Sequence, residues 1–381
     1  MNDLFKTIES LNEEYLQFLI DICSIESPTE CKAGVDSVGE YIEEKARKKG
    51  WLTERERQEI SGDVWCITMN ADAEGAPVCL SGHMDTVHPV GSFGYPCVRM
   101  DSENIYGPGV CDCKGGIAAA FMAMDALERC GFSSRPIKLI LQSDEENGSR
   151  NSAKATVRYM AKKAEGCAAF LNAEPGNSDG HSVSSKGICK FRFDITGKAA
   201  HSCACNEGAS AICEAAHKII RLEQFKNADH ILCNCGLISG GSAENTVPEK
   251  CTFTADFRYT TPEQYDEILT AVNEVSSVSH VEGTSCTYTL ASSRCAMAET
   301  EKNLELFEKV GSIYAKLGLG KMEKCEASGA SDAADLTQMG IPCLDGFGLI
   351  GGNIHRLSEF ARLDSLITAA KRMASVAWCI E

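Results

Sequence analysis

The chain has 381 residues, of which 44% are hydrophobic and 24% are charged, and these values are ordinary for a globular protein. Its formal net charge of −17 argues against a nucleic-acid partner, because a phosphate-binding surface needs clustered Lys and Arg. The N-terminal segment is amphipathic and acidic, unlike a signal peptide, and no apolar run reaches the ~18 residues of a membrane-spanning helix. We therefore expect a cytoplasmic protein with neither a nucleic-acid nor a membrane partner.

Two segments of helical spacing open the chain, and short apolar runs bounded by turn residues follow. Helices are expected at residues 2–22 and 33–49, and later at about 114–130 and 150–164. The apolar runs are DVWCITMN, APVCLSG, RPIKLILQ and GCAAFLNA. This alternation predicts an α/β fold with a mostly parallel sheet flanked by helices, in which ligands gather at the carboxyl ends of the strands.

The pattern changes near residue 184. A strand, a helix, two strands, a helix and a strand are expected at KGICKFRFDIT, 206–224, HILCNCGLIS, EKCTFTADFRY, 262–278 and SCTYTLA. The order βαββαβ predicts a separate small α+β domain of the ferredoxin-like kind. After residue 297 the earlier pattern resumes and closes with a helix near 363–378, so residues 184–296 are expected as an insert in a split domain of residues 1–183 and 297–381.

Twenty-one cysteines are scattered along the chain, and their odd number without a secretory signal predicts free thiols in a reducing cytoplasm. No C-x-x-C pair occurs, so a structural zinc knuckle is not expected. The closest spacings are C-x-C, at Cys111 and Cys113, Cys203 and Cys205, and Cys233 and Cys235. We interpret these residues as small buried side chains.

The run PVCLSGHMDTVH places His83 and Asp85 two positions apart at the end of an apolar strand. Residues at this spacing share a face of an extended segment. Asp85 can therefore accept the second ring N–H of His83 when that imidazole binds a metal. For this motif alone, a surface H-x-D beside a turn is the alternative interpretation.

Asp112 lies in the glycine-rich segment YGPGVCDCKGG. Glycines allow the backbone to come close to whatever the carboxylate binds. An ordinary loop before a helix is the alternative. A nucleotide-binding phosphate loop does not fit, because Lys114 precedes the glycine pair and no Ser or Thr follows it.

The apolar strand KLILQ runs into Asp144, Glu145 and Glu146. Adjacent residues of an extended segment point to opposite sides, so Glu146 can bind a metal while Glu145 faces the substrate as a general base. A solvated acidic loop is the alternative for the triplet alone.

Glu174 follows the apolar run FLNA, and His355 lies in the glycine-rich segment GGNIH. Together with the three earlier segments, they place a metal-binding residue at each of five points where a parallel sheet exposes its functional edge. Two His and three carboxylates, one of them bridging, suit two Zn²⁺, or Co²⁺ or Mn²⁺.

These segments resemble, in order along nearly the whole chain, the co-catalytic dizinc exopeptidases and deacylases. That family includes glutamate carboxypeptidase, acetylornithine deacetylase, succinyl-diaminopimelate desuccinylase, aminoacylase and peptidase T. The matching blocks are GHMDTV, YGPGVCDCKGG, DEENGS, AEPG, ITGKAAHS, ENTVPEKCTFTADFRY, SGASDAADL and GNIH. The glutamate carboxypeptidase branch is the most similar. The resemblance implies an aminopeptidase-like catalytic domain and an inserted lid that usually forms the dimer contact.

The resemblance also implies a role for each residue in these blocks. His83 and Glu174 would bind one metal, Glu146 and His355 the other, and Asp112 both, with Asp85 supporting His83 and Glu145 acting as the base. One departure is the pair of cysteines beside Asp112, where the family often has Asp or Met. Alternation along the backbone is expected to turn both thiols away from the metals.

Three residues of the insert resemble the family's lid residues. His201, in GKAAHS, is similar to a histidine that reaches the partner subunit's active site and binds the scissile carbonyl oxygen. Asn245 and Arg258 are similar to residues that hold the substrate, and a guanidinium suits a carboxylate. The alternatives are an ordinary surface histidine and, for Arg258, a structural ion pair.

We therefore expect a metal-dependent hydrolase in which a metal-bridging hydroxide attacks an amide carbonyl and Glu145 transfers the proton. The leading substrate is a small peptide or N-acyl amino acid with a free carboxylate, cleaved as by a carboxypeptidase, and a homodimer is expected. An N-acetyl or N-succinyl amino acid deacylase is the alternative. A catalytically silent binding protein on the same fold is the alternative of another class.

Overall fold

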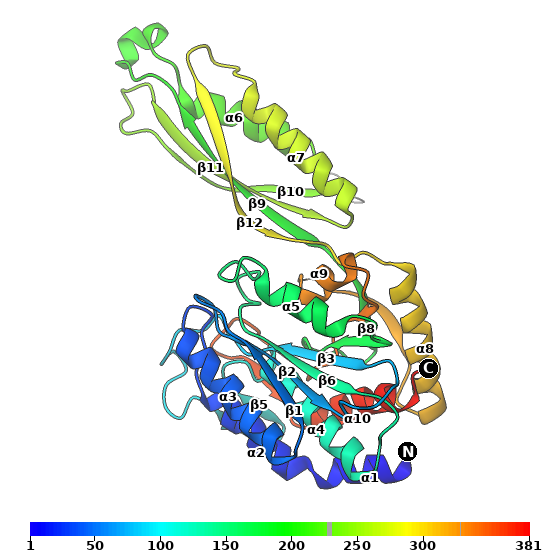
Figure 1. The fold of residues 1–381 in the computed structure, drawn as a ribbon. Coiled ribbons are helices and arrows are strands. Elements are labelled where there is room, and N and C mark those ends of the chain that lie inside the picture. The colour runs from blue at the N-terminus through cyan, green and yellow to red at the C-terminus, as the bar shows by residue number, and fades with distance from the viewer. Residues whose placement is uncertain (227–230, 328) are drawn as a thin grey trace. The chain divides into compact units, whose positions relative to one another are not determined.

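The computed structural model describes residues 1–226, 231–327 and 329–381, and the chain divides into two compact units (Figure 1). The larger unit comprises Met1–Val183, Glu299–Glu326 and Ser331–Glu381, and the smaller unit comprises Ser184–Ala298 and Ala327–Ala330. None of the helices in these described ranges combines the length and the apolar composition that crossing a bilayer demands.

A six-stranded sheet forms the centre of the larger unit. Its strands lie in the order β1 (Leu52–Glu56), β2 (Val64–Met69), β6 (Ile137–Gln142), β3 (Val78–His83), β7 (Ala169–Asn172) and β14 (Cys343–Leu344). The last four run parallel, β2 is antiparallel to β6, and β1 is antiparallel to β2. The expectation of a mostly parallel sheet is confirmed. Every residue of β2, β3 and β7 is buried, which explains why these strands are continuous apolar runs.

Helices cover both faces of this sheet (Figure 1). On one face α4 (Lys114–Arg129) packs on β3 and β6, and α10 (Asp364–Cys379), α1 (Asn2–Ser10) and α2 (Asn12–Ser24) pack against α4. On the other face α5 (Ala155–Ala164) packs on β2 and β6 and against α9 (Asp332–Gln338). In addition, α3 (Lys32–Lys48) contacts β1 and β2, and α8 (Glu301–Leu317) contacts β14 and α10.

Three predicted helices have clearly different bounds in the structure, and one of them, expected over about 206–224, begins at Ala211. The segment expected as one helix over 2–22 is two helices that meet at Leu11, whose N–H donates to the Ile8 carbonyl in a tighter turn. The helix expected from residue 150 begins only at Ala155. Ala153 and Lys154 have φ of 49° and 63°, and this left-handed backbone cannot continue into the preceding residues as an α-helix.

A small antiparallel sheet joins distant parts of the larger unit. It contains β15 (Gly351–Gly352), β16 (Phe360–Arg362), β5 (Asn104–Tyr106) and β4 (Arg99–Met100), in that order. The pairing of β16 with β5 aligns Phe360 with Tyr106. Since β5 ends just before the Asp112 loop and β15 and β16 flank His355, this sheet brings the two loops together.

The smaller unit has the element order βαββαβ. Its elements are β9 (Gly187–Thr196), α6 (Ala211–Glu223), β10 (Leu232–Gly240), β11 (Lys250–Tyr259), α7 (Pro262–Ser277) and β12 (Ser285–Arg294). The antiparallel sheet has the order β10-β11-β9-β12, and α6 and α7 pack on it over a phenylalanine-rich core of its own. The start of α7 is encoded locally, because Thr261 and Gln264 form a capping box and Pro262 is the first residue of the helix.

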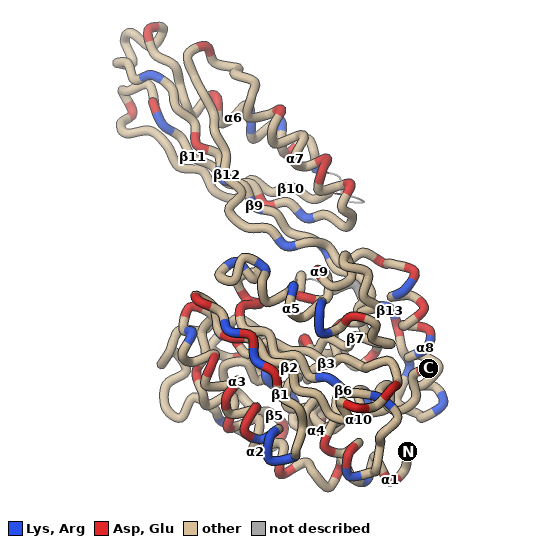
Figure 2. The backbone as a smooth tube through the Cα atoms, viewed as in Figure 1, with Lys and Arg blue, Asp and Glu red and all other residues tan. Residues whose placement is uncertain are grey.

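Three further elements complete the description: the 3₁₀ helix η1 (Ser202–Glu207) and the paired strands β8 (Gly180–Ser185) and β13 (Glu323–Ala327). Basic and acidic residues are interspersed along the backbone of both units (Figure 2).

Candidate metal centre

Five predicted metal ligands come together in the larger unit. His83 is the last residue of β3, Glu146 follows β6, and Glu174 follows β7. These three strands are neighbours and run parallel, so their carboxyl ends lie at one edge of the sheet. Asp112, just before α4, and His355, between β15 and β16, reach the same place.

The Asp112 carboxylate lies between the two imidazoles. Its Oδ1 is 3.1 Å from Nε2 of His83, and its Oδ2 is 3.2 Å from Nε2 of His355. On the first side, Nε2 of His83 is also 3.7 Å from Oε1 of Glu174. On the second side, Nε2 of His355 is 3.1 Å from Oε2 of Glu146. The cluster therefore has two halves that share one carboxylate.

Burial disfavours the negative charge of acidic side chains in this cluster. Desolvation raises the pKa of Glu146 to about 7 and, together with the Asp112 charge, raises the pKa of Glu174 well above its usual value. Contacts with Asp112 and Glu146 raise the pKa of His355 to about 10. Three acidic groups in so little water require positive charge beside them. Divalent cations would supply it, and a set of imidazole and carboxylate donors fits Zn²⁺, Co²⁺ or Mn²⁺.

The two halves differ in access to solvent. His83 is 2% exposed, whereas the His355 side chain is 53% exposed. A hollow of about 470 Å³ next to Glu146 is lined by Pro28, Val87, Pro89 and Val90 among others. An apolar group beside the cluster can occupy this space.

Asp85 holds the cluster in a way that differs in part from the expectation. Nδ1 of His83 is 2.9 Å from the backbone carbonyl of Asp85 and 3.5 Å from its Oδ1. The carboxylate itself accepts the backbone N–H groups of Glu145 and Glu146, at 3.2 and 3.1 Å, and the Thr29 hydroxyl at 2.8 Å. Asp85 thus ties the His83 strand end to the loop that carries the two glutamates.

The acidic residues that follow β6 have different surroundings. Asp144 accepts hydrogen bonds from the Ser152 N–H and the Thr156 hydroxyl, both at 2.9 Å, so it stabilises the loop before α5. Glu145 is 5% exposed, and Gly148 donates to its carbonyl at 2.7 Å in a tight turn. The solvated acidic loop weighed from the sequence is therefore absent at this place.

Sequence reasoning missed Glu359. Its Oε1 accepts the backbone N–H groups of Cys111 and Asp112 at 3.0 and 3.1 Å, and its Oε2 is 3.3 Å from Nε2 of His88. Glu359 therefore positions the Asp112 carboxylate through the backbone. It lies four residues after His355, but nothing in a single sequence distinguishes it from a surface glutamate.

The expected orientation of the two thiols beside Asp112 is wrong for Cys113. Alternation was expected to turn it away from the metals, but the backbone bends at Asp112, so its Sγ lies within 4.8 Å of ligand atoms of His83 and Glu174. This thiol donates to the Ala173 carbonyl at 3.0 Å. Cys111 does turn away, with its Sγ 3.7 Å from the Leu349 carbonyl.

The three predicted lid residues belong to the smaller unit. His201 and Asn245 lie close together there, since Ser202 donates to the Asn245 carbonyl at 2.9 Å. The His201 side chain is exposed, and its Nδ1 accepts the Cys203 N–H at 3.2 Å. Arg258 donates to Asp256 at 2.9 and 3.4 Å, which is the ion pair considered as its alternative. Any role of these residues toward the cluster stays a prediction.

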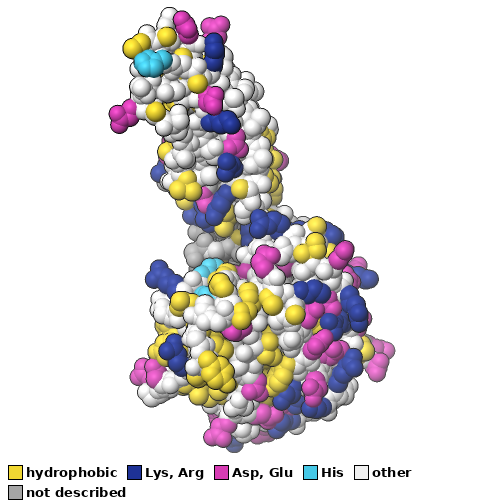
Figure 3. All heavy atoms as spheres, turned by 90° about the vertical axis from the view of Figure 1, so that its left-hand side faces the viewer, with side chains coloured by type: hydrophobic (Ala, Val, Ile, Leu, Met, Phe, Trp, Pro, Cys, Tyr) yellow, Lys and Arg dark blue, Asp and Glu magenta, His cyan; other side chains and the backbone are white. Residues whose placement is uncertain are grey.

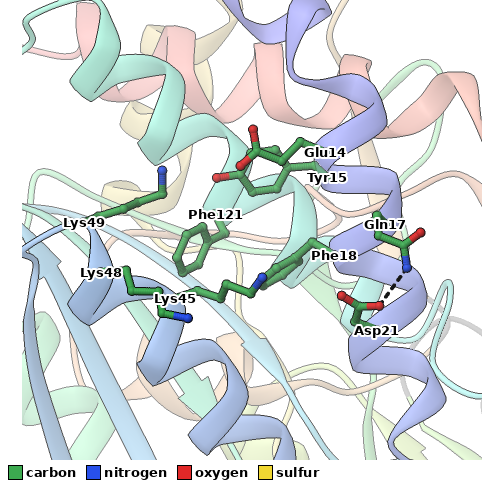
Figure 4. Close-up of a pocket in the computed structure, with 9 residues that line it drawn as sticks. All are labelled: Glu14, Tyr15, Gln17, Phe18, Asp21, Lys45, Lys48, Lys49 and Phe121. Carbon is green, nitrogen blue, oxygen red and sulfur yellow. Dashed lines mark hydrogen bonds between the residues drawn. The ribbon is translucent and has the colours of Figure 1, made fainter.

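A second cavity, of about 510 Å³, lies between α2, α3 and α4 and contains none of the cluster residues (Figure 4). Tyr15, Phe18 and Phe121 form its aromatic wall, and lysines of α3 line its opposite side. Lys48 already pairs with Glu44 at 2.5 Å, and Lys49 with Asp125 at 2.7 Å. None of the residues predicted for catalysis or metal binding lines this cavity.

One face of the larger unit carries a concentration of hydrophobic side chains (Figure 3). Large hydrophobic residues exposed on this unit include Val87, Val90, Tyr95, Ile354 and Leu357. Val87 and Val90 also line the hollow beside Glu146, so apolar surface continues from the cluster outward.

Comparisons with known proteins agree with these motifs. The model of peptidase family M20/M25/M40 matches residues 79–378. Carboxypeptidase G2 of Pseudomonas sp. (strain RS-16) is 26% identical over 361 residues, which cover 93% of this chain and 86% of that protein. Succinyl-diaminopimelate desuccinylase of Xanthomonas campestris pv. campestris (strain B100) is 24% identical over 378 residues, covering 93% and 96%. The crystal structure of aminopeptidase PepT from Bacillus cereus ATCC 10987 has a TM-score of 0.80 at 18% identity and covers 97% of this chain and 98% of its own.

Proposed function

Because this chain belongs to peptidase family M20/M25/M40, we propose that it hydrolyses the amide bond of a peptide or N-acyl amino acid that bears a free carboxylate. One observation carries the proposal: the Asp112 carboxylate presents one oxygen to His83 and the other to His355. A carboxylate shared in this way suits two divalent cations. Two such ions, when bound, would polarise the substrate carbonyl and lower the pKa of water.

The chain's own residues would hold these ions and move the proton. His83 and Glu174 would hold one ion and His355 and Glu146 the other, with Asp112 between them. Glu145 would take a proton from the attacking water and pass it to the leaving nitrogen, as a general base and then a general acid. Its backbone N–H bond to Asp85 supports this role, because it orients the loop beside the ligands.

The lid residues would complete the site. As the resemblance implies, His201 would donate a hydrogen bond to the carbonyl oxygen of substrate in the partner subunit's site as negative charge develops there, and Arg258 with Asn245 would hold the substrate carboxylate. An N-acyl amino acid deacylase is the second candidate, and the 24% identity to a succinyl-diaminopimelate desuccinylase favours it. Both candidates use the same carbonyl chemistry and differ in the group on either side of the amide.

We also propose a homodimer formed through the smaller unit and a cytoplasmic location. β10 is at the edge of its sheet and exposes Leu237 (71%) and Ile238 (55%). On the adjacent helix α6, Ile220 is 59% exposed, and an exposed apolar strand edge of this kind favours pairing with another chain. Hydrodynamic mass tests the dimer. The free state of all 21 cysteines supports a reducing compartment.

The first experiment measures metal content and hydrolysis together. Reconstituted protein should bind two equivalents of Zn²⁺, Co²⁺ or Mn²⁺ at the cluster. It should hydrolyse some members of a panel of dipeptides and N-acyl amino acids that have a free carboxylate. Glu145→Ala should keep the metal and lose at least about 10²-fold in turnover. The surface substitution Glu165→Ala is the control. If Glu145→Ala keeps wild-type turnover at unchanged metal content, the role proposed for Glu145 is wrong. If the reconstituted wild-type protein binds less than one metal equivalent, a catalytically silent binding protein is favoured.

A further inference from the structure

A second group of metal-ligating side chains lies in the smaller unit, outside the catalytic cluster. Glu223 is the last residue of α6, and Cys233 and Cys235 are on β10. One ligand atom from each of the three residues lies within 4.8 Å of the others. The spacing C-x-C did not predict a site, because the third ligand comes from another element.

The fold places both thiols on the side of the sheet that α6 covers. Residues two apart on a strand share a face. Accordingly Cys233 is buried in the core of the smaller unit, Asn234 is exposed, and Cys235 is half-buried. The register of β10 against β11 shifts between Asn234 and Leu237, so the second thiol itself lies where the strand departs from regular pairing.

Glu223 already holds this part of the strand. Its Oε1 accepts the backbone N–H of Cys235 at 2.7 Å, which is a donor that an irregular edge strand leaves without a partner strand. A carboxylate has two acceptor oxygens, so one can hold the strand while the other binds an ion. The helix end and the two thiols are therefore kept together before any ion arrives.

The two thiols also interact with each other. Their mutual hydrogen bond lowers the pKa of Cys235 and raises that of Cys233. Two adjacent sulfurs that share protons form an arrangement that a cation stabilises further, because metal binding releases the protons to solvent and removes the repulsion between thiolates.

We propose that Cys233, Cys235 and Glu223 bind a thiophilic metal ion, with Zn²⁺ as the expected occupant. Two sulfurs and one carboxylate oxygen match zinc better than Ca²⁺ or Mg²⁺, and the half-burial of Cys235 and Glu223 leaves an ion access to their ligand atoms. Binding would clamp β10 to the end of α6. The site is separate from the catalytic cluster and does not depend on the proposed function.

The experiment uses the full chain and two probes, Zn²⁺ and Co²⁺. Zn²⁺ stoichiometry is measured after dialysis, and Co²⁺ is followed by the near-ultraviolet charge-transfer absorption of a thiolate–Co²⁺ bond. The test variant is Cys233→Ser with Cys235→Ser. The matched control is Cys203→Ser with Cys205→Ser, a pair of the same spacing that is exposed, so that the burial expected from the sequence is wrong for it. Cys113→Ser removes the thiol near the catalytic cluster.

The test variant should bind one equivalent of Zn²⁺ fewer than the wild type and lose the Co²⁺ absorption, while both control variants retain a thiolate–Co²⁺ band. Glu223→Gln should weaken Zn²⁺ at this site at least about tenfold, and it keeps the proposal testable if the double variant does not fold. The proposal is overturned if the double variant binds as much Zn²⁺ as the wild type. It is equally overturned if anaerobically purified protein contains a disulfide between Cys233 and Cys235.

Discussion

Removal of the Glu359 side chain should destabilise the loop that carries the bridging carboxylate. Glu359 is 1% exposed and accepts the backbone N–H groups of Cys111 and Asp112. In Glu359→Ala both buried donors lose their acceptor. At about 1–3 kcal/mol for each buried donor left unsatisfied, the free energy of unfolding should fall by about 2–6 kcal/mol. The affinity for catalytic metal should fall about 10–100-fold, because Asp112 is no longer positioned.

Glu359→Gln is the matched variant, because its amide oxygen can accept the same two N–H groups and its NH₂ can donate to Nε2 of His88. It should lie within about 1 kcal/mol of the wild type in urea unfolding of metal-free protein. Two results would refute the reasoning. If Glu359→Ala is as stable as the wild type, water replaces the carboxylate as the acceptor of the two N–H groups. If Glu359→Gln is destabilised as much as Glu359→Ala, the negative charge of Glu359 matters more than its acceptor oxygen.

Two further predictions concern the stability of the larger unit. Burial, with a contribution from Arg372, lowers the pKa of His181 to about 3, and its Nε2 is 2.8 Å from the Tyr314 hydroxyl. The unfolded chain binds a proton on His181 near pH 6.5, whereas the folded chain does so only near pH 3. The free energy of unfolding should therefore fall by about 4–5 kcal/mol as the pH falls from 6.5 toward 3. Urea unfolding across this range checks it, and the same pH dependence in His181→Gln would contradict it. Gly116→Ala should destabilise by about 1–3 kcal/mol, because its Cβ would lie 2.1 Å from the Ala173 carbonyl oxygen where α4 meets β7. Gly311→Ala is the control, since the atom nearest to its added Cβ is 4.0 Å away. Its free energy of unfolding, measured in thermal melts, should rise by about 0.5–1 kcal/mol. Equal melting temperatures for the two variants would contradict the close approach at Gly116.

The cluster of predicted metal ligands could be predicted from the sequence because most of its residues lie at the ends of strands. His83, Glu146 and Glu174 each lie at or within four residues of the end of a strand, and parallel neighbouring strands end at one edge. Local periodicity was therefore enough to predict the parallel sheet. The same reasoning placed a helix over 150–164, but the left-handed residues before Ala155 depend on the Asp144 loop and not on local propensity.

Amino-acid order by itself indicated most of the strands and helices and the segments that carry the predicted metal ligands, since these properties follow from patterns a few residues long. Only the tertiary structure decided that Glu359 holds the Asp112 backbone, that Cys113 turns toward His83, and that Glu223 reaches two thiols of β10. Each of these contacts joins residues whose approach depends on the register of a distant strand pair or on the end of a packed helix. No local pattern encodes that register, because it is selected by the packing of the whole unit.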